Sequence, residues 1–110
     1  MSNQNKLPEC PLEITLLLYG DRWKTLIVRE LLIGTKRFGE LKKSLTGISQ
    51  KVLTQHLRMM EEFGLLHREV YAEIPPKVEY SLTELGESLK VIQDVMFRWG
   101  EDYKEKTTDS

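Results

Sequence analysis

Apolar residues in the first 63 positions recur three or four positions apart, which places them on one face of an α-helix. The segments with this spacing are residues 12–19, 22–32, 38–45 and 50–63. Pro11 suits the first turn of a helix, Asp21 and Ser49 are of the types that cap helix N-termini, and Gly64 suits a helix end. The pattern therefore predicts four helices, each with its own start or stop signal.

After Gly64 the spacing of apolar residues changes to two. Apolar and polar side chains alternate in residues 66–73 and again in residues 77–82, which is typical of strands with one solvated face. Pro75 and Pro76 lie in the connection between them, where the N–H groups of a strand ladder are not needed. The pattern predicts a β-hairpin over residues 66–82.

A last helix completes the predicted order of elements. Thr83 is its expected cap, and apolar residues three or four positions apart continue as far as Tyr103. Gly47 lies in the short connection before the fourth helix, so the third and fourth helices form a helix-turn-helix and the hairpin forms a wing. We expect a mainly α chain with a small β-hairpin (an α+β winged helix-turn-helix) over residues 10–103, with flexible tails at residues 1–9 and 104–110.

Composition narrows the class of protein. The 110 residues are 40% hydrophobic and 30% charged, which is ordinary for one globular domain. No run of 18 apolar residues exists, and the first ten residues are too polar for a secretory signal. The single cysteine, Cys10, allows no internal disulfide, which fits a reducing compartment. We expect a cytoplasmic protein with no membrane contact.

The distribution of charge is more informative than its total. The whole chain has a formal net charge of -1, but residues 22–58 hold nine Lys and Arg against only Glu30 and Glu40, a net charge of +7. Residues 59–110 carry six bases against twelve acids, and residues 1–21 carry one base against three acids. A polyanion responds to the local field, so the basic segment favours a nucleic acid as partner.

The fourth predicted helix has an outer face of unusual composition. Its polar residues, on the side opposite the apolar stripe, are Gln50, Lys51, Thr54, Gln55 and Arg58. These residue types pair with base edges and phosphates, and they begin the second helix of a helix-turn-helix, where base contacts are made. The alternative is an ordinary solvated face, but the acid–base pairs that such faces favour are scarce here. We therefore expect this helix to read the major groove of DNA.

Further contacts with the DNA backbone follow from the same arrangement. Ser49 and the first N–H groups of the helix can bind a phosphate. The basic residues beside the motif are expected to add sequence-independent attraction, and they are Lys36, Arg37, Lys42 and Lys43. Lys77, next to the wing tip, either contacts the backbone or minor groove or is a solvated lysine of the hairpin.

The sequence disfavours one rival class of function and leaves a second one open. An enzyme is disfavoured because the only histidines, His56 and His67, are distant from Cys10 in sequence, and neither a zinc-ligand spacing nor a phosphate-binding loop occurs. His56 falls in the apolar arc of its helix and is expected to be packed and neutral. We predict no cofactor and no metal. A winged-helix module for protein–protein contact stays open, although such a module would favour apolar residues on the outer face of helix 50–63.

Several blocks of sequence, in order, resemble one known family. The blocks are CPLE, DRWKTLIVRELL, RFGELKKSLTGISQKVLTQHLRMMEEFGLLHREVY, PPKVEYSLTELGESL and RWGE. They cover residues 10–101 and are similar to HxlR-type winged helix-turn-helix transcriptional regulators, a MarR-like group. The resemblance implies a bacterial, sequence-specific regulator of transcription, expected to be a repressor, that binds double-stranded DNA as a homodimer. It also implies that the first and last helices make the dimer contact.

The residues themselves agree with dimerisation. The last helix carries more apolar surface than a small domain needs, although part of it must complete the core. The residues expected at the dimer contact are Leu12, Ile92, Met96, Trp99 and Tyr103. A two-fold dimer would hold two reading helices roughly 34 Å apart over a palindromic operator. Bound to DNA, the protein would be associated with the nucleoid, and no small-molecule effector is assigned.

Cys10 stands immediately before Pro11, at the start of the first helix. The family resemblance implies that a cysteine in this position can sense oxidants or electrophiles. A helix N-terminus favours the reactive thiolate, whereas a lone cysteine inside a cell is more often a buried apolar residue. Without a second cysteine, a sensor would work through an intermolecular disulfide or a thiol adduct.

Overall fold

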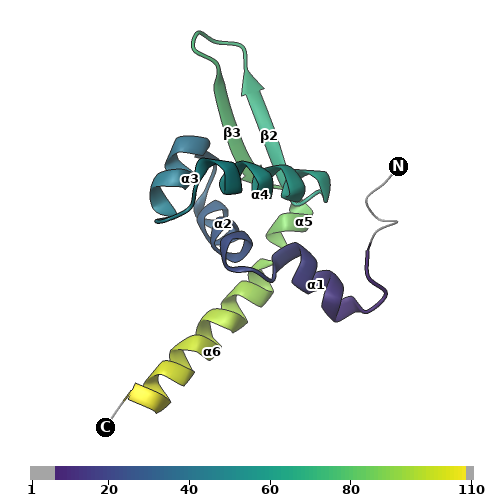
Figure 1. Cartoon of the computed structure of the whole chain (residues 1–110), viewed down its shortest axis with the longest axis vertical. Coiled ribbons are helices and arrows are strands. Elements are labelled where there is room, and N and C mark those ends of the chain that lie inside the picture. The colour runs from purple at the N-terminus through teal and green to yellow at the C-terminus, as the bar shows by residue number, and fades with distance from the viewer. Residues whose placement is uncertain (1–6, 109–110) are drawn as a thin grey trace.

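The structure, a computed structural model, describes residues 7–108. Its elements, in order, are α1 (Pro11–Tyr19), α2 (Arg22–Ile33), β1 (Lys36–Arg37), α3 (Phe38–Ser44), α4 (Gln50–Glu62), β2 (Leu66–Tyr71), β3 (Lys77–Leu82), α5 (Glu84–Glu87) and α6 (Lys90–Thr108). Helices α3 and α4 form the helix-turn-helix, and the β2–β3 hairpin rises beyond α4 as the wing (Figure 1). The order confirms the predicted winged helix-turn-helix.

The predicted caps hold the helix ends. The Asp21 carboxylate accepts the N–H of Lys24 at 2.9 Å, and the Ser49 hydroxyl accepts the N–H of Val52 at 3.1 Å. Each cap satisfies a backbone donor that has no partner inside its helix. Gly64 follows α4 with φ of +81°, in the left-handed region that glycine adopts without steric cost. Local sequence therefore sets where α2 and α4 begin and where α4 gives way to the wing.

The core lies between α2, α3 and α4 and is closed by the start of the wing. Its fully buried residues include Ile27 and Val28 of α2, Leu41 of α3, and Leu53 and Leu57 of α4. The remaining buried apolar residues are Tyr19, Leu31, Leu45, Ile48, Met60, Leu65 and Leu66. Burial of this stripe of α4 fixes which of its faces points outward.

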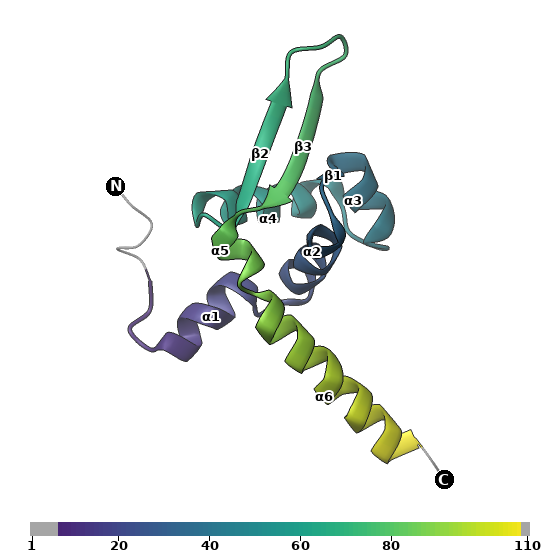
Figure 2. The same ribbon diagram turned by 180° about the vertical axis from the view of Figure 1, so that it is seen from behind.

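The wing belongs to a sheet of three strands in the order β1-β3-β2, all antiparallel. Strands β2 and β3 pair from Leu66 opposite Leu82 to Tyr71 opposite Lys77, as the alternation predicted. Strand β1, which the sequence pattern did not predict, pairs with β3 and is visible beside α3 in Figure 2. Two residues are too few to show a period of two, so β1 becomes visible only through its partner strand.

The single last helix predicted after Thr83 is wrong, because two helices occur there. Thr83 caps α5, accepting the N–H of Gly86 at 3.0 Å, but α5 ends at Glu87 and a turn precedes α6. A side chain at position 86 would meet the carbonyl oxygen of Leu65 at 2.2 Å, so α5 lies directly against the start of the wing. The turn lets α5 stay there while Ile92 of α6 reaches the core.

Helix α6 projects away from the body, on the side opposite the wing (Figures 1 and 2). It continues to Thr108, so residues 104–108, expected to belong to a flexible tail, are helical. Residues 7–9 carry no helix or strand, and the rest of the two predicted tails, residues 1–6 and 109–110, lies outside the described part of the chain. Among residues 7–108, none of the helices is both long enough and apolar enough to cross a membrane.

Candidate nucleic-acid interface

The outer face of α4 is an exposed polar surface. Gln50, Lys51, Gln55 and Arg58 are exposed, and Thr54 beside them is half-buried. These five residues line one shallow hollow along the helix, so the structure brings the predicted reading residues together. Their neighbours on the inner side of α4, among them Leu53, Leu57 and Met60, are in the core, so the polar residues lie on the outer side of the helix.

The first turn of α4 adds donors to this surface. The Ser49 hydroxyl accepts a hydrogen bond from Val52, and the carbonyl of Ser49 accepts the N–H of Leu53 at 3.0 Å. The N–H groups of Gln50 and Lys51 come before any carbonyl that could accept them within the helix. Both residues are exposed, so the start of α4 presents positive partial charge to the outside.

The basic residues around α3 lie on the surface, whereas the acids of this segment are occupied. Arg37, Lys42 and Lys43 are exposed and Lys36 is half-buried. Glu40 accepts the backbone N–H of Arg37 at 2.8 Å and so caps α3. Glu30 is buried and pairs with Arg29 at 2.9 Å. The positive charge around the helix-turn-helix is therefore met by few exposed acids.

Two bases counted in the charge of +7 do not contribute to this surface. Lys24 is only 8% exposed, pairs with Asp21 at 3.0 Å and donates to the carbonyl of Leu17 at 2.9 Å. Arg29 is held by Glu30. The net charge of residues 22–58 thus overstates the positive electrostatic field at the outer face of α4. The basic residues that contribute most to this field are those of β1, α3 and α4.

Lys77 lies apart from the α4 surface. Its ammonium nitrogen is 4.5 Å from the centre of the Tyr71 ring and 3.8 Å from the Glu79 carboxylate. The side chain is half-buried against the wing instead of extending from it. The two alternatives left by the sequence, a contact with DNA and a solvated lysine of the hairpin, stay predictions.

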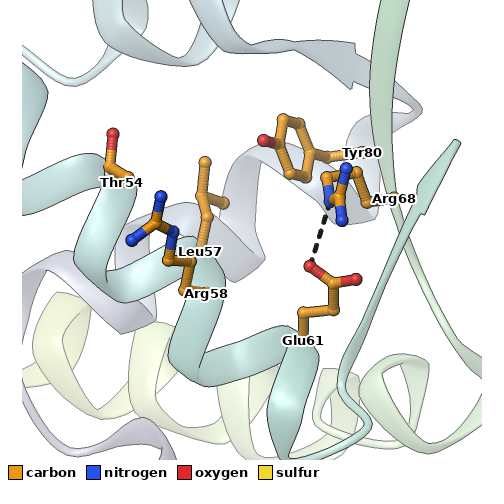
Figure 3. Close-up of a pocket in the computed structure, with 6 residues that line it drawn as sticks. All are labelled: Thr54, Leu57, Arg58, Glu61, Arg68 and Tyr80. Atoms are coloured by element: carbon orange, nitrogen blue, oxygen red, sulfur yellow. Dashed lines mark hydrogen bonds and ion pairs between the residues drawn. The ribbon is translucent and has the colours of Figure 1, made fainter. Parts of the chain in front are cut away.

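A second hollow, which the sequence did not indicate, joins the α4 surface to the wing (Figure 3). It is lined by Thr54, Leu57, Arg58, Glu61, Arg68 and Tyr80. Glu61 at the end of α4 accepts a hydrogen bond from Nε of Arg68 on β2 at 3.2 Å. Arg68 stands among the polar positions of an alternating strand, so the pattern marks it only as solvent-facing. The strand register places Tyr80 of β3 directly opposite Arg68.

The residues expected at a dimer contact are mostly exposed on α1 and α6. Leu12 is 68% exposed and Trp99 is 66% exposed, with its ring stacked on that of Tyr103 at 5.5 Å. Met96 is also exposed, whereas Ile92 is partly buried and packs against the core of its own chain. The same two helices also expose four further apolar residues, which are Leu16, Val91, Val95 and Phe97.

Helix α1 starts at an exposed cysteine. Cys10 is the N-cap of α1, its carbonyl accepts the N–H of Ile14 at 3.1 Å, and its side chain makes no cap hydrogen bond. Cys10 is exposed. The buried apolar role, one of the two alternatives for this residue, is wrong.

His56, on the inner side of α4, contacts the junction of α1 and α2. Its Nε2 atom lies 4.0 Å from the Asp21 carboxylate, and its side chain is 19% exposed. Burial lowers the pKa of His56, and nearby Lys24 acts in the same direction, although Asp21 opposes both. Burial alone would raise the pKa of Asp21, but hydrogen bonds from Lys24 bring that pKa below its usual value. His56 is thus packed and favoured in its neutral form, as its helical position predicted.

Helix α1 is tied to α6 at its other end. The Tyr19 hydroxyl donates to the side-chain carbonyl of Gln93, and burial, with a smaller effect of Asp94, raises the pKa of Tyr19 to about 12. The ring is almost completely buried. The two helices expected to form the dimer contact are therefore held in a defined arrangement.

The family model for the HxlR-like helix-turn-helix matches residues 18–108, which include the whole motif and wing. The chain belongs to the HxlR-like helix-turn-helix family. Among curated relatives of this HxlR-like chain, the uncharacterized HTH-type transcriptional regulator YdeP of Bacillus subtilis is 47% identical over 97 residues, 88% of this chain and 76% of YdeP. The protein is accordingly a helix-turn-helix transcriptional regulator.

Solved structures of similar proteins share the fold. The redox regulator HypR in its reduced form is 44% identical and matches with a TM-score of 0.83, covering 86% of this chain and 94% of HypR. The diamide-treated YodB from B. subtilis is 35% identical, with a TM-score of 0.72, covering 92% of this chain and 97% of YodB. The HxlR-like chain is thus similar in fold to regulators whose descriptions concern redox chemistry.

The environment of His56 predicts a pH-dependent stability. Because its pKa is lowered in the folded protein, the unfolded chain binds the proton more readily, and stability present above the ordinary value of 6.5 is lost as the pH falls below it. When the pH is lowered from about 7.5 to about 5.5, the urea concentration at the unfolding midpoint should fall less for His56→Gln than for the wild type. An equal loss in wild type and His56→Gln would contradict the assignment.

Proposed function

We propose that this protein is a sequence-specific regulator that binds double-stranded DNA with α4 in the major groove. The observation that carries the proposal is the exposed face of α4, where Gln50, Lys51, Thr54, Gln55 and Arg58 line one surface and no acid interrupts them. Amide and guanidinium groups form paired hydrogen bonds with base edges, so they supply the chemistry of direct readout. The proposed location is the cytoplasm, with the nucleoid as the site of action.

Phosphate contacts would come from residues that flank α4. Ser49 and the first N–H groups of α4 suit one phosphate, and Arg37, Lys42 and Lys43 are exposed beside them. Lys77 could add a contact from the wing only after leaving Tyr71 and Glu79. Because a protein bound over a promoter blocks access to it, we propose repression as the mode of regulation.

Substitutions on the reading face test the proposal. Gln55→Ala and Arg58→Ala should each weaken operator binding by about 1–3 kcal/mol, because each removes a base or phosphate contact. Gel shifts against promoter fragments and shuffled fragments measure affinity and preference together. Gln55→Ala should in addition lower the preference between the two kinds of fragment.

Arg98→Ala is the matched control, since Arg98 is an exposed arginine on α6 and should leave binding unchanged. If both reading-face variants bind as tightly as wild type, with unchanged preference, the docking of this face is wrong. If the wild-type protein binds no promoter fragment even at low salt, the alternative of a winged-helix module for protein contact replaces DNA binding.

We further propose that the protein acts as a homodimer through α1 and α6. The support is the apolar surface these helices expose, with Leu12, Phe97, Trp99 and Tyr103 each more than half exposed in the single chain. Exposed apolar surface of this extent is characteristic of an association site. A two-fold axis through these helices would present two copies of α4 to a palindromic operator.

Trp99→Glu tests the dimer. A charge at this position would be desolvated in an apolar contact, so the dimer dissociation constant should rise at least about thirtyfold, equivalent to 2 kcal/mol. Sedimentation velocity over a range of concentrations measures it. Lys104→Glu places an acid on a polar stretch of the same helix and should leave the dimer intact. A monomeric wild type, or an undisturbed Trp99→Glu dimer, would contradict the proposed contact.

We also propose that Cys10 senses oxidants. Its exposure at the start of α1 supports this, as does similarity to proteins described as the redox regulator HypR and a diamide-treated YodB. With diamide, two Cys10 thiols from two protomers would lose two protons and two electrons to the reagent and form one disulfide. A small electrophile would instead form an adduct with one thiolate. Either change would alter α1, which the proposed dimer contact includes.

Diamide treatment gives the test for Cys10. Operator affinity of the wild type should change by about fivefold or more after treatment, which is the range of typical allosteric coupling. Cys10→Ser should bind the operator like the untreated wild type and should not respond. Equal responses in the two proteins would exclude Cys10 from the mechanism.

A further inference from the structure

The hollow between α4 and the wing is continuous with the proposed DNA-reading surface. It has a volume of about 290 Å³, and two of its residues, Thr54 and Arg58, also line the reading surface of α4. Its other wall is the wing, which contributes Arg68 and Tyr80 (Figure 3). A ligand that runs from the reading face toward the wing must therefore pass this hollow.

Arg68 is oriented within the hollow by a single acid. Its Nε atom donates to Oε1 of Glu61 at 3.2 Å, and the two side chains are 43% and 37% exposed. Among residues 7–108, no other carboxylate pairs with this guanidinium, so its two terminal NH₂ groups remain for an outside acceptor. A guanidinium held at Nε presents a planar pair of donors, the geometry that suits a phosphate.

Tyr80 supplies a further donor on the same wall. It lies directly opposite Arg68 in the strand register, and its ring lines the hollow. A tyrosine hydroxyl is protonated at neutral pH and can donate a hydrogen bond, and burial raises the pKa of Tyr80 further. Arg58, Arg68 and the Tyr80 hydroxyl thus surround the hollow with donors, and Glu61 is the one acid in its lining.

The course of the DNA backbone decides what this hollow would hold. With α4 in the major groove and the wing against the flanking minor groove, the strand that separates the two grooves crosses the gap between α4 and β2. We propose that the hollow binds one phosphate of that strand, with Arg68 as its direct ligand and Glu61 as the residue that positions Arg68. This inference rests on the proposed DNA binding and adds a contact at the wing that fixes the depth of α4 in the groove.

Operators with single neutral phosphates test the contact directly. Replacing one phosphate at a time by methylphosphonate should identify a position between the half-site and the wing where the wild type loses roughly tenfold in affinity, the value of a hydrogen bond to a charged group. For Arg68→Ala, a methylphosphonate at that position should no longer change the affinity. The affinity of this variant for the unmodified operator should already be roughly tenfold lower than that of the wild type. Preference among base sequences should not change, because a phosphate carries no base identity.

Salt dependence gives a readout that a merely structural role of Arg68 would not alter. Arg68→Ala should reduce the slope of log affinity against log salt by about 1, whereas Arg68→Lys should keep the slope and lose part of the affinity. Arg98→Ala, which removes an equal charge from α6, should change neither the operator affinity nor the salt slope. Circular dichroism and urea unfolding check that each variant is folded. If Arg68→Ala does not fold, Arg68→Gln replaces it as the variant without the charge, and its affinity and salt slope are compared with those of Arg68→Lys.

The neighbouring acids on α4 separate positioning from simple charge removal. Glu62→Ala removes one negative charge from an exposed residue and should tighten binding slightly. Glu61→Ala removes the same charge but also releases Arg68, so its affinity should be severalfold below that of Glu62→Ala. In the Arg68→Ala background the two acid variants should bind equally, because Glu61 then has no arginine to position.

The outcomes distinguish this inference from the proposed function. If the wild type binds its operator and Arg58→Ala weakens binding, while Arg68→Ala changes neither affinity nor salt slope, the phosphate site is wrong and DNA reading by α4 stands. If Glu61→Ala and Glu62→Ala bind the operator with equal affinity when Arg68 is present, Glu61 has no positioning role. If the wild type binds no DNA, both proposals fall together.

Discussion

The burial of one stripe of α4 is the constraint on which the rest of the structure depends. Leu53, Leu57 and Met60 are almost completely buried against α2 and α3. Truncating a buried leucine of this kind costs about 2–5 kcal/mol, so rotating α4 to expose the stripe would remove much of the stability of a small domain. The rotation of α4 is therefore fixed by the packing of its inner side, and this packing directs its polar face outward.

The acids of the chain are arranged so that they leave this face positive. Glu30 is buried with Arg29, Glu40 caps α3, and Glu61 holds Arg68. Each carboxylate has a structural partner, which lowers its effect on an approaching polyanion. Most other acids follow residue 61 in sequence, and α6 carries several of them to the far side of the molecule from the wing (Figure 1). A total charge of -1 is thus compatible with a positive surface around α4.

The two ends of the molecule have different surfaces. The outer face of α4 presents polar and basic side chains, whereas α1 and α6 expose apolar ones. Between them, Lys24 joins Asp21 to the carbonyl of Leu17 in α1, and His56 of α4 lies against the same acid. Lys24, Asp21 and His56 therefore form a short series of polar contacts between α1 and the inner side of α4.

The sequence alone determined the first four helices, their caps, the hairpin and the polar face of α4, because each depends on residues within a few positions of one another. Asp21, Ser49 and Gly64 could be assigned to helix ends from their neighbours alone. Only the tertiary structure decided what depends on distant segments. It paired β1 with β3, split the last helix where Gly86 meets Leu65, and folded Lys77 onto Tyr71. It also brought Arg68 to Glu61 and Tyr80, since strand register and the packing of the wing on α4 set those distances.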